Sequence, residues 1–170
     1  LLKQGIPAKQ MVIAGDSAGG NFTITSLMKL RDEGDPLPTA AACLSPVIDM
    51  TNKETVFDEV YDAVLHPKAT KRMNVSYIAD NDPYHPLLSP ALGDWSGLPP
   101  LLIHAGEDEI LRDDAVRAEQ LATEAGVDVR LKIYPRMWHV WQVHLGLPES
   151  TQSLHDIAQF LKSHVGAQHI

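Results

Sequence analysis

The sequence has few of the features that point to secretion or to metal binding. A single cysteine, Cys43, is present among 170 residues. One thiol excludes an internal disulfide bond and a cluster of thiolate metal ligands. We therefore expect a reducing compartment, with the cytoplasm as the default location, although one free cysteine is also compatible with export.

Long hydrophobic runs are also lacking. A membrane-spanning helix needs about 18 or more consecutive apolar residues, and the apolar runs here, such as 11–15 and 101–103, have only the length of β-strands. Residues 1–10 contain no basic region followed by an apolar stretch, so they do not resemble a signal peptide. They also lack an initiator methionine, and we expect the chain to be part of a longer protein.

Positive charge is scarce as well. The chain has 14 lysine and arginine residues against 22 aspartate and glutamate residues, which gives a formal net charge of −8. Because loose binding to a phosphate backbone or to anionic lipid needs clustered cations, this balance argues against both partners. The proportions of hydrophobic residues (44%) and charged residues (21%) are close to those of soluble globular proteins, which excludes a disordered or collagen-like chain.

Short apolar runs alternate with amphipathic stretches, as in β-strands joined by helices in a parallel sheet. The strands are expected at 11–15, 39–44, 101–105 and 127–133, and the helices at about 18–32, 113–125 and 151–165. Charged residues alternate with apolar ones in the fourth strand, which predicts a position near a sheet edge. The fold class is therefore α/β, in a single domain over residues 1–170.

A long irregular insert, about residues 46–97, separates the second and third expected strands. It contains two short expected helices, around 56–64 and 69–78, followed by a proline-rich stretch at 82–90. Connections of this length usually carry function or are disordered.

A G-x-S-x-G pattern follows the first expected strand, with Ser17 between Gly15 and Gly19. It closes an apolar strand and opens a helix, which is the context that a nucleophile elbow requires. A serine on such a strained turn needs neighbours without a Cβ atom. The helix that begins at Ala18 directs its free N–H groups toward a developing oxyanion. The alternative interpretation is a glycine-rich turn with an incidental serine.

A serine nucleophile needs a base and a carboxylate that orients the base, in the chain order serine, acid, histidine. Asp108 follows the third expected strand and His139 follows the fourth, so both lie at the sheet edge that carries Ser17. We therefore predict a triad of Ser17, Asp108 and His139. Other acidic residues in the same stretch are interpreted as solvated loop or helix N-terminal charges, although the sequence excludes none of them; they are Glu107, Glu109, Asp113 and Asp114.

The remaining candidates have structural alternatives. His104 lies inside an apolar strand and is interpreted as a hydrogen-bonded core histidine, and Cys43 as a small core residue. Trp138 and Trp141 flank the candidate base, where they line an acyl pocket or anchor the loop to the core. His144 has no HExxH-type partner, so no metal site is expected.

These motifs resemble the hormone-sensitive-lipase family of carboxylesterases, which has the α/β-hydrolase fold. The stretches that carry the resemblance are 15–21, 89–90 leading into 98–102, 106–113 and 137–140. The resemblance implies hydrolysis of short acyl esters by Ser17 through an acyl-enzyme, without a cofactor. It also implies that His139 is the base, that Asp108 orients it, and that the backbone N–H of Ala18 contributes to the oxyanion hole.

One departure from the family concerns its His-Gly-Gly-Gly oxyanion motif, which normally lies upstream of the elbow and does not occur here. The resemblance thus implies the C-terminal part of a catalytic domain, without the N-terminal half and most of the lid. The first strand would then have an exposed edge, and such an edge pairs readily with another chain. We therefore expect self-association or pairing with the missing N-terminal segment.

Two further functions remain open at this point. The same triad would also serve an amidase or a deacetylase of small molecules. In a different class, the chain would be a truncated, non-catalytic relic that acts as an interaction module.

Overall fold

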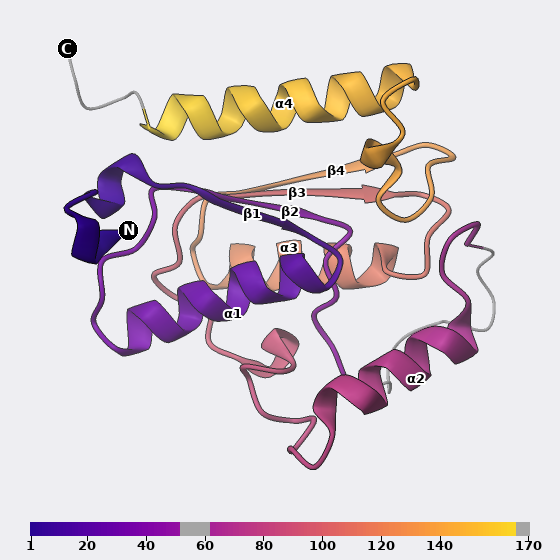
Figure 1. The fold of residues 1–170 in the computed structure, drawn as a ribbon, viewed down its shortest axis with the longest axis horizontal. Helices are drawn as coiled ribbons and strands as arrows, with labels where there is room; N and C mark the ends of the chain where they lie inside the picture. Colours follow the sequence, from indigo (N-terminus) through magenta and orange to yellow (C-terminus); the bar gives the residue numbers. More distant parts are fainter. Residues whose placement is uncertain (52–61, 166–170) are drawn as a thin grey trace.

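The computed structural model describes residues 1–51 and 62–165, and these form three layers. A four-stranded parallel sheet with the order β1-β2-β3-β4 is the central layer. Helix α4 covers one face of the sheet, while α1 and α3 cover the other (Figure 1). The expected α/β class is therefore confirmed.

The four strands occur where the apolar runs predict them. Their bounds are β1 Ile13–Asp16, β2 Ala41–Leu44, β3 Leu101–Gly106 and β4 Val129–Tyr134. Strand β4 lies at one edge of the sheet with alternately exposed side chains, as the alternating charges predict. Strand β3 is buried along its whole length because it has a strand on each side and helices above and below.

The three long helices also follow the expected pattern, with bounds α1 Ala18–Asp32, α3 Arg112–Glu124 and α4 Pro148–Val165. Helix α1 buries Ile24, Leu27 and Met28 against the sheet. Helix α3 is followed by Gly126, whose φ of 75° is the left-handed conformation that ends many helices. Helix α4 begins three residues earlier than expected, at Pro148, because proline is well suited to a first helical position.

Alternate residues of the central strands supply two separate cores. Ala41 and Cys43 face the core beneath α1 and α3, whereas Ala42 and Leu102 face the core beneath α4. The interpretation of Cys43 as a core residue is confirmed, since it is 1% exposed. Burial also raises the pKa of its thiol to about 12, so Cys43 stays protonated and is not a second nucleophile.

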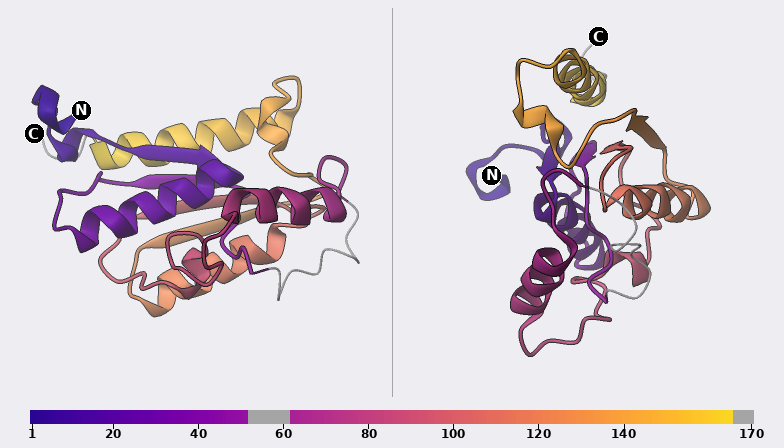
Figure 2. Two further views of the ribbon diagram at one scale, coloured as in Figure 1. Left: turned by 60° about the horizontal axis from the view of Figure 1, so that its bottom comes forward. Right: turned by 90° about the vertical axis from the view of Figure 1, so that its right-hand side faces the viewer.

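The insert after β2 contributes α2 (Pro67–Ile78), which lies beside the N-terminal half of α1 (Figure 2). This helix matches the one expected at 69–78, whereas most of the helix expected at 56–64 lies outside the described residues. Further along the insert, Trp95 is 2% exposed and its indole Nε1 donates to the carbonyl of Pro90 (2.9 Å). No helix in the described parts of the chain combines the length and the apolar character needed to cross a membrane.

Candidate active site

All four strands run in the same direction, so their C-terminal ends share one edge of the sheet, on the right of Figure 1. Ser17 follows β1, Ser45 follows β2, Glu109 lies in the loop after β3, and His139 lies in the loop after β4. Open α/β sheets place their ligand sites at this edge. The chain therefore collects a hydroxyl, a carboxylate and an imidazole where such a fold places its chemistry.

Ser17 forms the turn between β1 and α1 and has an unusual backbone conformation. Its φ is 53° and its ψ is −118°, which is strained for a residue that carries a side chain. The turn is fixed from the neighbouring segments, because Ser17 N donates to Leu44 O (2.8 Å) and Ser17 O accepts from Gly20 N (3.0 Å). This is the geometry expected of a nucleophile elbow.

Close packing around Ser17 requires glycine at some of the neighbouring positions but not at all of them. A Cβ atom on Gly15 would lie 2.2 Å from the carbonyl oxygen of Gly19, and one on Gly20 would lie 2.8 Å from the Cβ of Pro46. A Cβ atom on Gly19 would approach no closer than 4.0 Å, to Asp16 Oδ1. Close packing of the turn therefore requires Gly15 and Gly20, whereas Gly19 has room for a methyl group.

Ala18 is the first residue of α1, so its backbone N–H belongs to the helix turn whose donors have no partner within the helix. This N–H donates no hydrogen bond to another described residue. The positive end of the helix dipole lies at the same point. Ala18 is thus placed as the sequence predicts for an oxyanion donor.

His139 is paired with Glu109. Its Nδ1 atom lies 3.6 Å from Glu109 Oε2, and the two side chains are 6% and 0% exposed. Neither His139 Nδ1 nor Glu109 Oε1 has a hydrogen-bond partner among the described residues. Catalytic hydrogen bonds are often long in a resting site and shorten when substrate is bound. Likewise, Ser17 makes no hydrogen bond to His139 within the described residues.

Asp108, the predicted acid, occupies a different place. It is exposed, and it lines a small cavity together with Arg136 and Trp138. Its backbone N–H donates to Met137 O (2.9 Å), and Arg136 N donates to Glu107 Oε2 (3.0 Å). These bonds join the loop after β3 to the loop after β4 and leave Asp108 on the outside. The geometry therefore favours Glu109 over Asp108 as the partner of His139.

The other acidic residues after β3 only partly match the expectation of solvated charges. Glu107 is exposed, and Asp113 forms an exposed ion pair with Arg112 (3.0 Å). Glu109 is 1% exposed, so its interpretation as a solvated charge is wrong. Asp114 lies in the first turn of α3, as the helix N-terminal interpretation predicts, but it is 5% exposed and accepts from Ile48 N (2.8 Å), and burial raises the pKa of its carboxyl to about 7.

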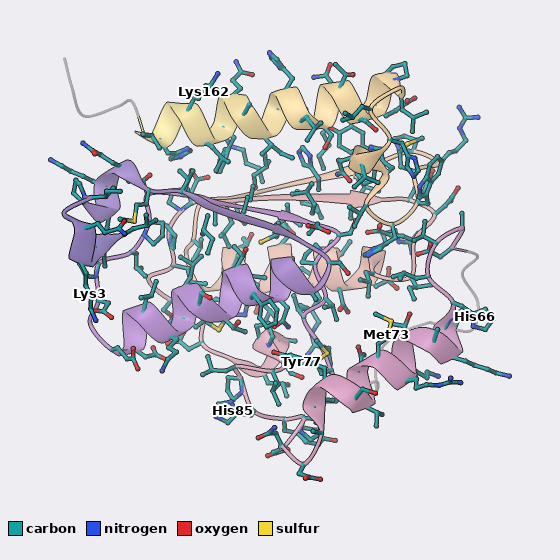
Figure 3. The ribbon with its side chains drawn as sticks, viewed as in Figure 1. Lys3, His66, Met73, Tyr77, His85 and Lys162 are labelled. Carbon is teal, nitrogen blue, oxygen red and sulfur yellow. The ribbon has the colours of Figure 1, made fainter. Side chains whose placement is uncertain are left out.

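A cavity of about 150 Å³ lies beside Ser17 and Ala18. Its walls are largely apolar and come from α1, from α2, from the segment after β2 and from Leu111 in front of α3. Figure 3 shows Met73 and Tyr77 pointing from α2 toward the side on which α1 lies, and the Tyr77 ring meets Phe22 edge to face at 5.8 Å. The insert therefore forms one wall of the space in front of the candidate nucleophile.

The two tryptophans next to His139 fit the anchoring alternative. Trp141 is fully buried and packs against Tyr134 and Met137. Trp138 makes an edge contact with His144, with the ring centroids 5.6 Å apart. The cavity beside Ser17 is lined instead mainly by residues of the insert and of α1. Neither indole lines the cavity beside Ser17 in the described part of the chain, which favours the anchoring alternative.

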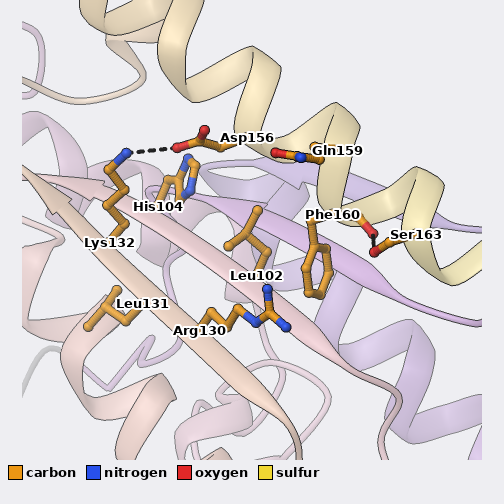
Figure 4. A pocket seen from close by; sticks show the side chains of 9 residues that line it. All are labelled: Leu102, His104, Arg130, Leu131, Lys132, Asp156, Gln159, Phe160 and Ser163. Carbon is orange, nitrogen blue, oxygen red and sulfur yellow. Dashed lines mark hydrogen bonds and ion pairs between the residues drawn. The ribbon is translucent and has the colours of Figure 1, made fainter.

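His104 is the core histidine that the sequence predicts. It is 1% exposed, and its Nδ1 atom lies 2.8 Å from Ser153 Oγ. Burial lowers its pKa from 6.5 to about 4. Figure 4 shows it beside the ion pair of Lys132 and Asp156 (2.7 Å), in a larger cavity of about 670 Å³ between α4 and the sheet. That cavity contains none of the strand-end residues described above.

Comparisons with known proteins agree with this architecture. Residues 2–143 match the model of the alpha/beta hydrolase fold family. An acetyl-hydrolase of Streptomyces hygroscopicus is 42% identical over 98% of this chain, and an esterase of Acinetobacter venetianus is 36% identical over 96%. The chain spans 56% and 55% of the length of these two relatives.

Solved structures give the same result. A crystal structure of an esterase from the bacterial hormone-sensitive lipase family superposes with a TM-score of 0.92 at 38% identity, over 97% of this chain and 57% of that one. A crystal structure of an esterase/lipase from an uncultured bacterium gives a TM-score of 0.90 at 37% identity, over 98% of this chain and 57% of that one. The chain belongs to the α/β-hydrolase fold family and, within it, to the hormone-sensitive-lipase family.

Proposed function

We propose that this chain carries the catalytic machinery of a serine hydrolase that cleaves short-chain carboxylic esters. One observation carries the proposal: Ser17 lies on a strained strand-to-helix turn, at the sheet edge that also holds the buried pair of His139 and Glu109. Functional sites are where such backbone strain is retained. The esterases and the acetyl-hydrolase among the relatives support the same class of reaction.

The reaction proceeds through an acyl-enzyme. Ser17 Oγ attacks the ester carbonyl carbon while His139 takes the hydroxyl proton. The carbonyl oxygen becomes an oxyanion beside the Ala18 N–H and the N-terminus of α1. When the tetrahedral intermediate collapses, the bond to the alcohol oxygen breaks and His139 protonates the leaving alkoxide. A water molecule, deprotonated by His139, then attacks the acyl carbon. The bond from that carbon to Ser17 Oγ breaks, His139 returns the proton to Ser17 Oγ, and the acid is released.

Glu109 is the orienting acid in this proposal, in place of Asp108. A carboxylate beside Nδ1 fixes the tautomer in which Nδ1 carries the proton, so Nε2 is left free to accept the serine proton. Glu109 is the acidic side chain that lies next to Nδ1. Its burial strengthens its attraction to the imidazolium that forms during the reaction, because charges interact more strongly away from water.

The size of the cavity beside Ser17 supports a short acyl group. Apolar cavities of about 150 Å³ accept molecules the size of benzene, and the cavity here has about that volume. An acyl chain of up to about six carbons would fit by this comparison. The name of the Streptomyces relative, an acetyl-hydrolase, favours acetyl groups as a second candidate substrate, on oxygen or on nitrogen.

The proposal is tested by assaying the purified protein with p-nitrophenyl acetate, butyrate and palmitate, and with p-nitroacetanilide as the amide. We expect turnover of the two short esters, little turnover of the palmitate, and loss of turnover in Ser17→Ala. Ser96→Ala is the matched control, since Ser96 is exposed and lies in the insert, outside the site. Faster cleavage of the anilide would favour the amidase alternative, and a protein inert to every substrate would favour the non-catalytic interaction module.

A further inference from the structure

Ser45 contributes a hydroxyl at the strand ends that the proposed reaction does not use. It directly follows β2, its side chain is fully buried, and it lies between the loop after β3 and the loop after β4. Its backbone N–H donates to His104 O (2.7 Å), which extends the pairing of β2 with β3. The hydroxyl is therefore held at a fixed point beside the pair of His139 and Glu109.

The hydrogen bonds of this hydroxyl have only one consistent direction. The backbone N–H of Val140 can only donate, and it lies 3.2 Å from Ser45 Oγ. The oxygen therefore accepts from Val140, and its single proton is left for Glu109 Oε2, which lies 2.8 Å away. Ser45 thus joins the carboxylate to the main chain of the residue that follows His139.

The backbone at Ser45 is strained, like that of Ser17. Its φ is 46°, in the left-handed region that favours glycine. Glycine would adopt this conformation without a steric penalty but would contribute no hydroxyl. Strain of this kind persists where the surrounding structure enforces it, and it concentrates at functional sites. The hydroxyl is the feature that a glycine at this position would lose.

We propose that Ser45 is a positioning residue that holds Glu109 against His139. This inference rests on the proposed function of the His139–Glu109 pair. The bond to Oε2 fixes one oxygen of a carboxylate whose other oxygen, Oε1, has no partner among the described residues. The hydrogen bond from Val140 N connects the loop that carries His139 to the same hydroxyl. Ser45 therefore acts through Glu109 and does not contact the substrate.

Removing the hydroxyl has two consequences that act in the same direction. The Glu109 carboxylate loses its donor, so it either binds a proton more readily or attracts the imidazolium of His139 more strongly. Both effects keep a proton on the pair at higher pH, so the acid limb of the pH–rate profile moves to higher pH. Loss of a hydrogen bond to a charged group weakens the interaction that it supports on the order of 10-fold to 100-fold. We expect a decrease of that size in kcat with little change in KM, because Ser45 is not among the residues that line the cavity beside Ser17.

The test compares Ser45→Ala and Ser45→Gly with the full wild-type chain. Alanine keeps the strained backbone and glycine relieves it, but both variants lack the hydroxyl. Ser89→Ala is the matched control, because Ser89 is equally buried and its Oγ bonds to Met50 N (2.9 Å) and Pro83 O (2.7 Å), away from Glu109. The two readouts are the pH dependence of kcat and KM for p-nitrophenyl acetate, and the pH midpoint of the His139 side-chain ¹⁵N resonances.

The proposal predicts a lower kcat and a shifted acid limb in both Ser45 variants, a shifted ¹⁵N midpoint for His139, and none of these changes in Ser89→Ala. Wild-type values in either Ser45 variant would overturn it, as would an equal shift in Ser89→Ala. If the wild-type chain hydrolyses no ester, the proposed function fails, but the ¹⁵N midpoint still decides whether Ser45 controls His139. If Ser45→Ala does not fold, the unstrained Ser45→Gly supplies the same comparison.

Discussion

Nδ1 of His139 lies 3.6 Å from Oε2 of Glu109, and both side chains are almost completely shielded from water. Glu109 comes from the loop after β3 and His139 from the loop after β4, so the pair depends on how these two loops meet. They meet closely: a Cβ atom on Gly106 would lie 2.1 Å from Met137 O. Close backbone approach at the end of β3 therefore brings the acid and the base together.

The first prediction separates the two neighbouring acids. Glu109→Gln keeps the size of the side chain but removes the charge that orients His139, so kcat should fall by orders of magnitude, on the order of 10⁴ in the best-studied triad. Asp108→Asn is the matched control and should stay within a few-fold of wild type, because Asp108 is exposed. Steady-state kinetics with p-nitrophenyl butyrate measures both. The reverse order of effects would restore Asp108 to the triad.

The second prediction concerns the glycines of the elbow. Gly15→Ala places a methyl group 2.2 Å from Gly19 O, so the turn must move or the protein must unfold. We expect a loss of stability of about 3 kcal/mol or more, at the upper end of the overpacking range. Gly19→Ala meets nothing closer than 4.0 Å and lies in α1, so it should stabilise the protein by about 0.5–1 kcal/mol.

Urea unfolding of both glycine variants and of the wild type measures these differences. Equal effects of the two substitutions would show that the turn is looser than the structure indicates. A stable Gly15→Ala variant with normal activity would contradict the tight elbow described here.

The third prediction links His104 to acid stability. Its pKa falls from 6.5 to about 4 on folding because burial disfavours the charged ring. The unfolded chain therefore takes up a proton on this ring below about pH 6.5, while the folded protein does not. The contribution of His104 to the free energy of unfolding is fully present above that pH and is lost as the pH falls toward 4. A difference of one in pKa corresponds to about 1.4 kcal/mol, so this group alone accounts for up to roughly 3 kcal/mol.

The measurement is the free energy of unfolding of wild type and His104→Gln at pH 7 and at pH 4.5. Glutamine cannot titrate, so the advantage of the wild type over the variant should shrink at the lower pH. Ser153→Ala, which removes the partner of His104 Nδ1, is a useful control because it retains the titrating ring. An advantage that does not change with pH would mean that His104 is not the source of the acid sensitivity.

Much of the fold could be predicted because it depends on local patterns. Helix α1 has the predicted bounds, since its apolar spacing begins and ends with clear signals at Ser17 and Gly34. The position of β4 at an edge follows from its alternating charges. The position of Ser17 on a sharp turn could also be predicted, because the elbow is a local strand-to-helix motif.

The acid of the site was harder to predict, for a physical reason. Glu107, Asp108 and Glu109 are consecutive in a loop, where no periodicity indicates which side chain points inward. The choice is made by contacts with residues that are distant in sequence, above all the 2.8 Å hydrogen bond from Ser45, which directly follows the neighbouring strand. The signal that could have identified Glu109 is the buried serine at the adjacent strand end, which needs a polar partner.

The most direct test of the central claim is labelling with a fluorophosphonate, followed by peptide mapping. Only an activated serine displaces the fluoride and retains the phosphonyl group on its oxygen. The account predicts modification of Ser17, no modification in Ser17→Ala, and much slower labelling in His139→Gln and Glu109→Gln. Labelling at another residue, or labelling at Ser17 at the wild-type rate in both His139→Gln and Glu109→Gln, would contradict it.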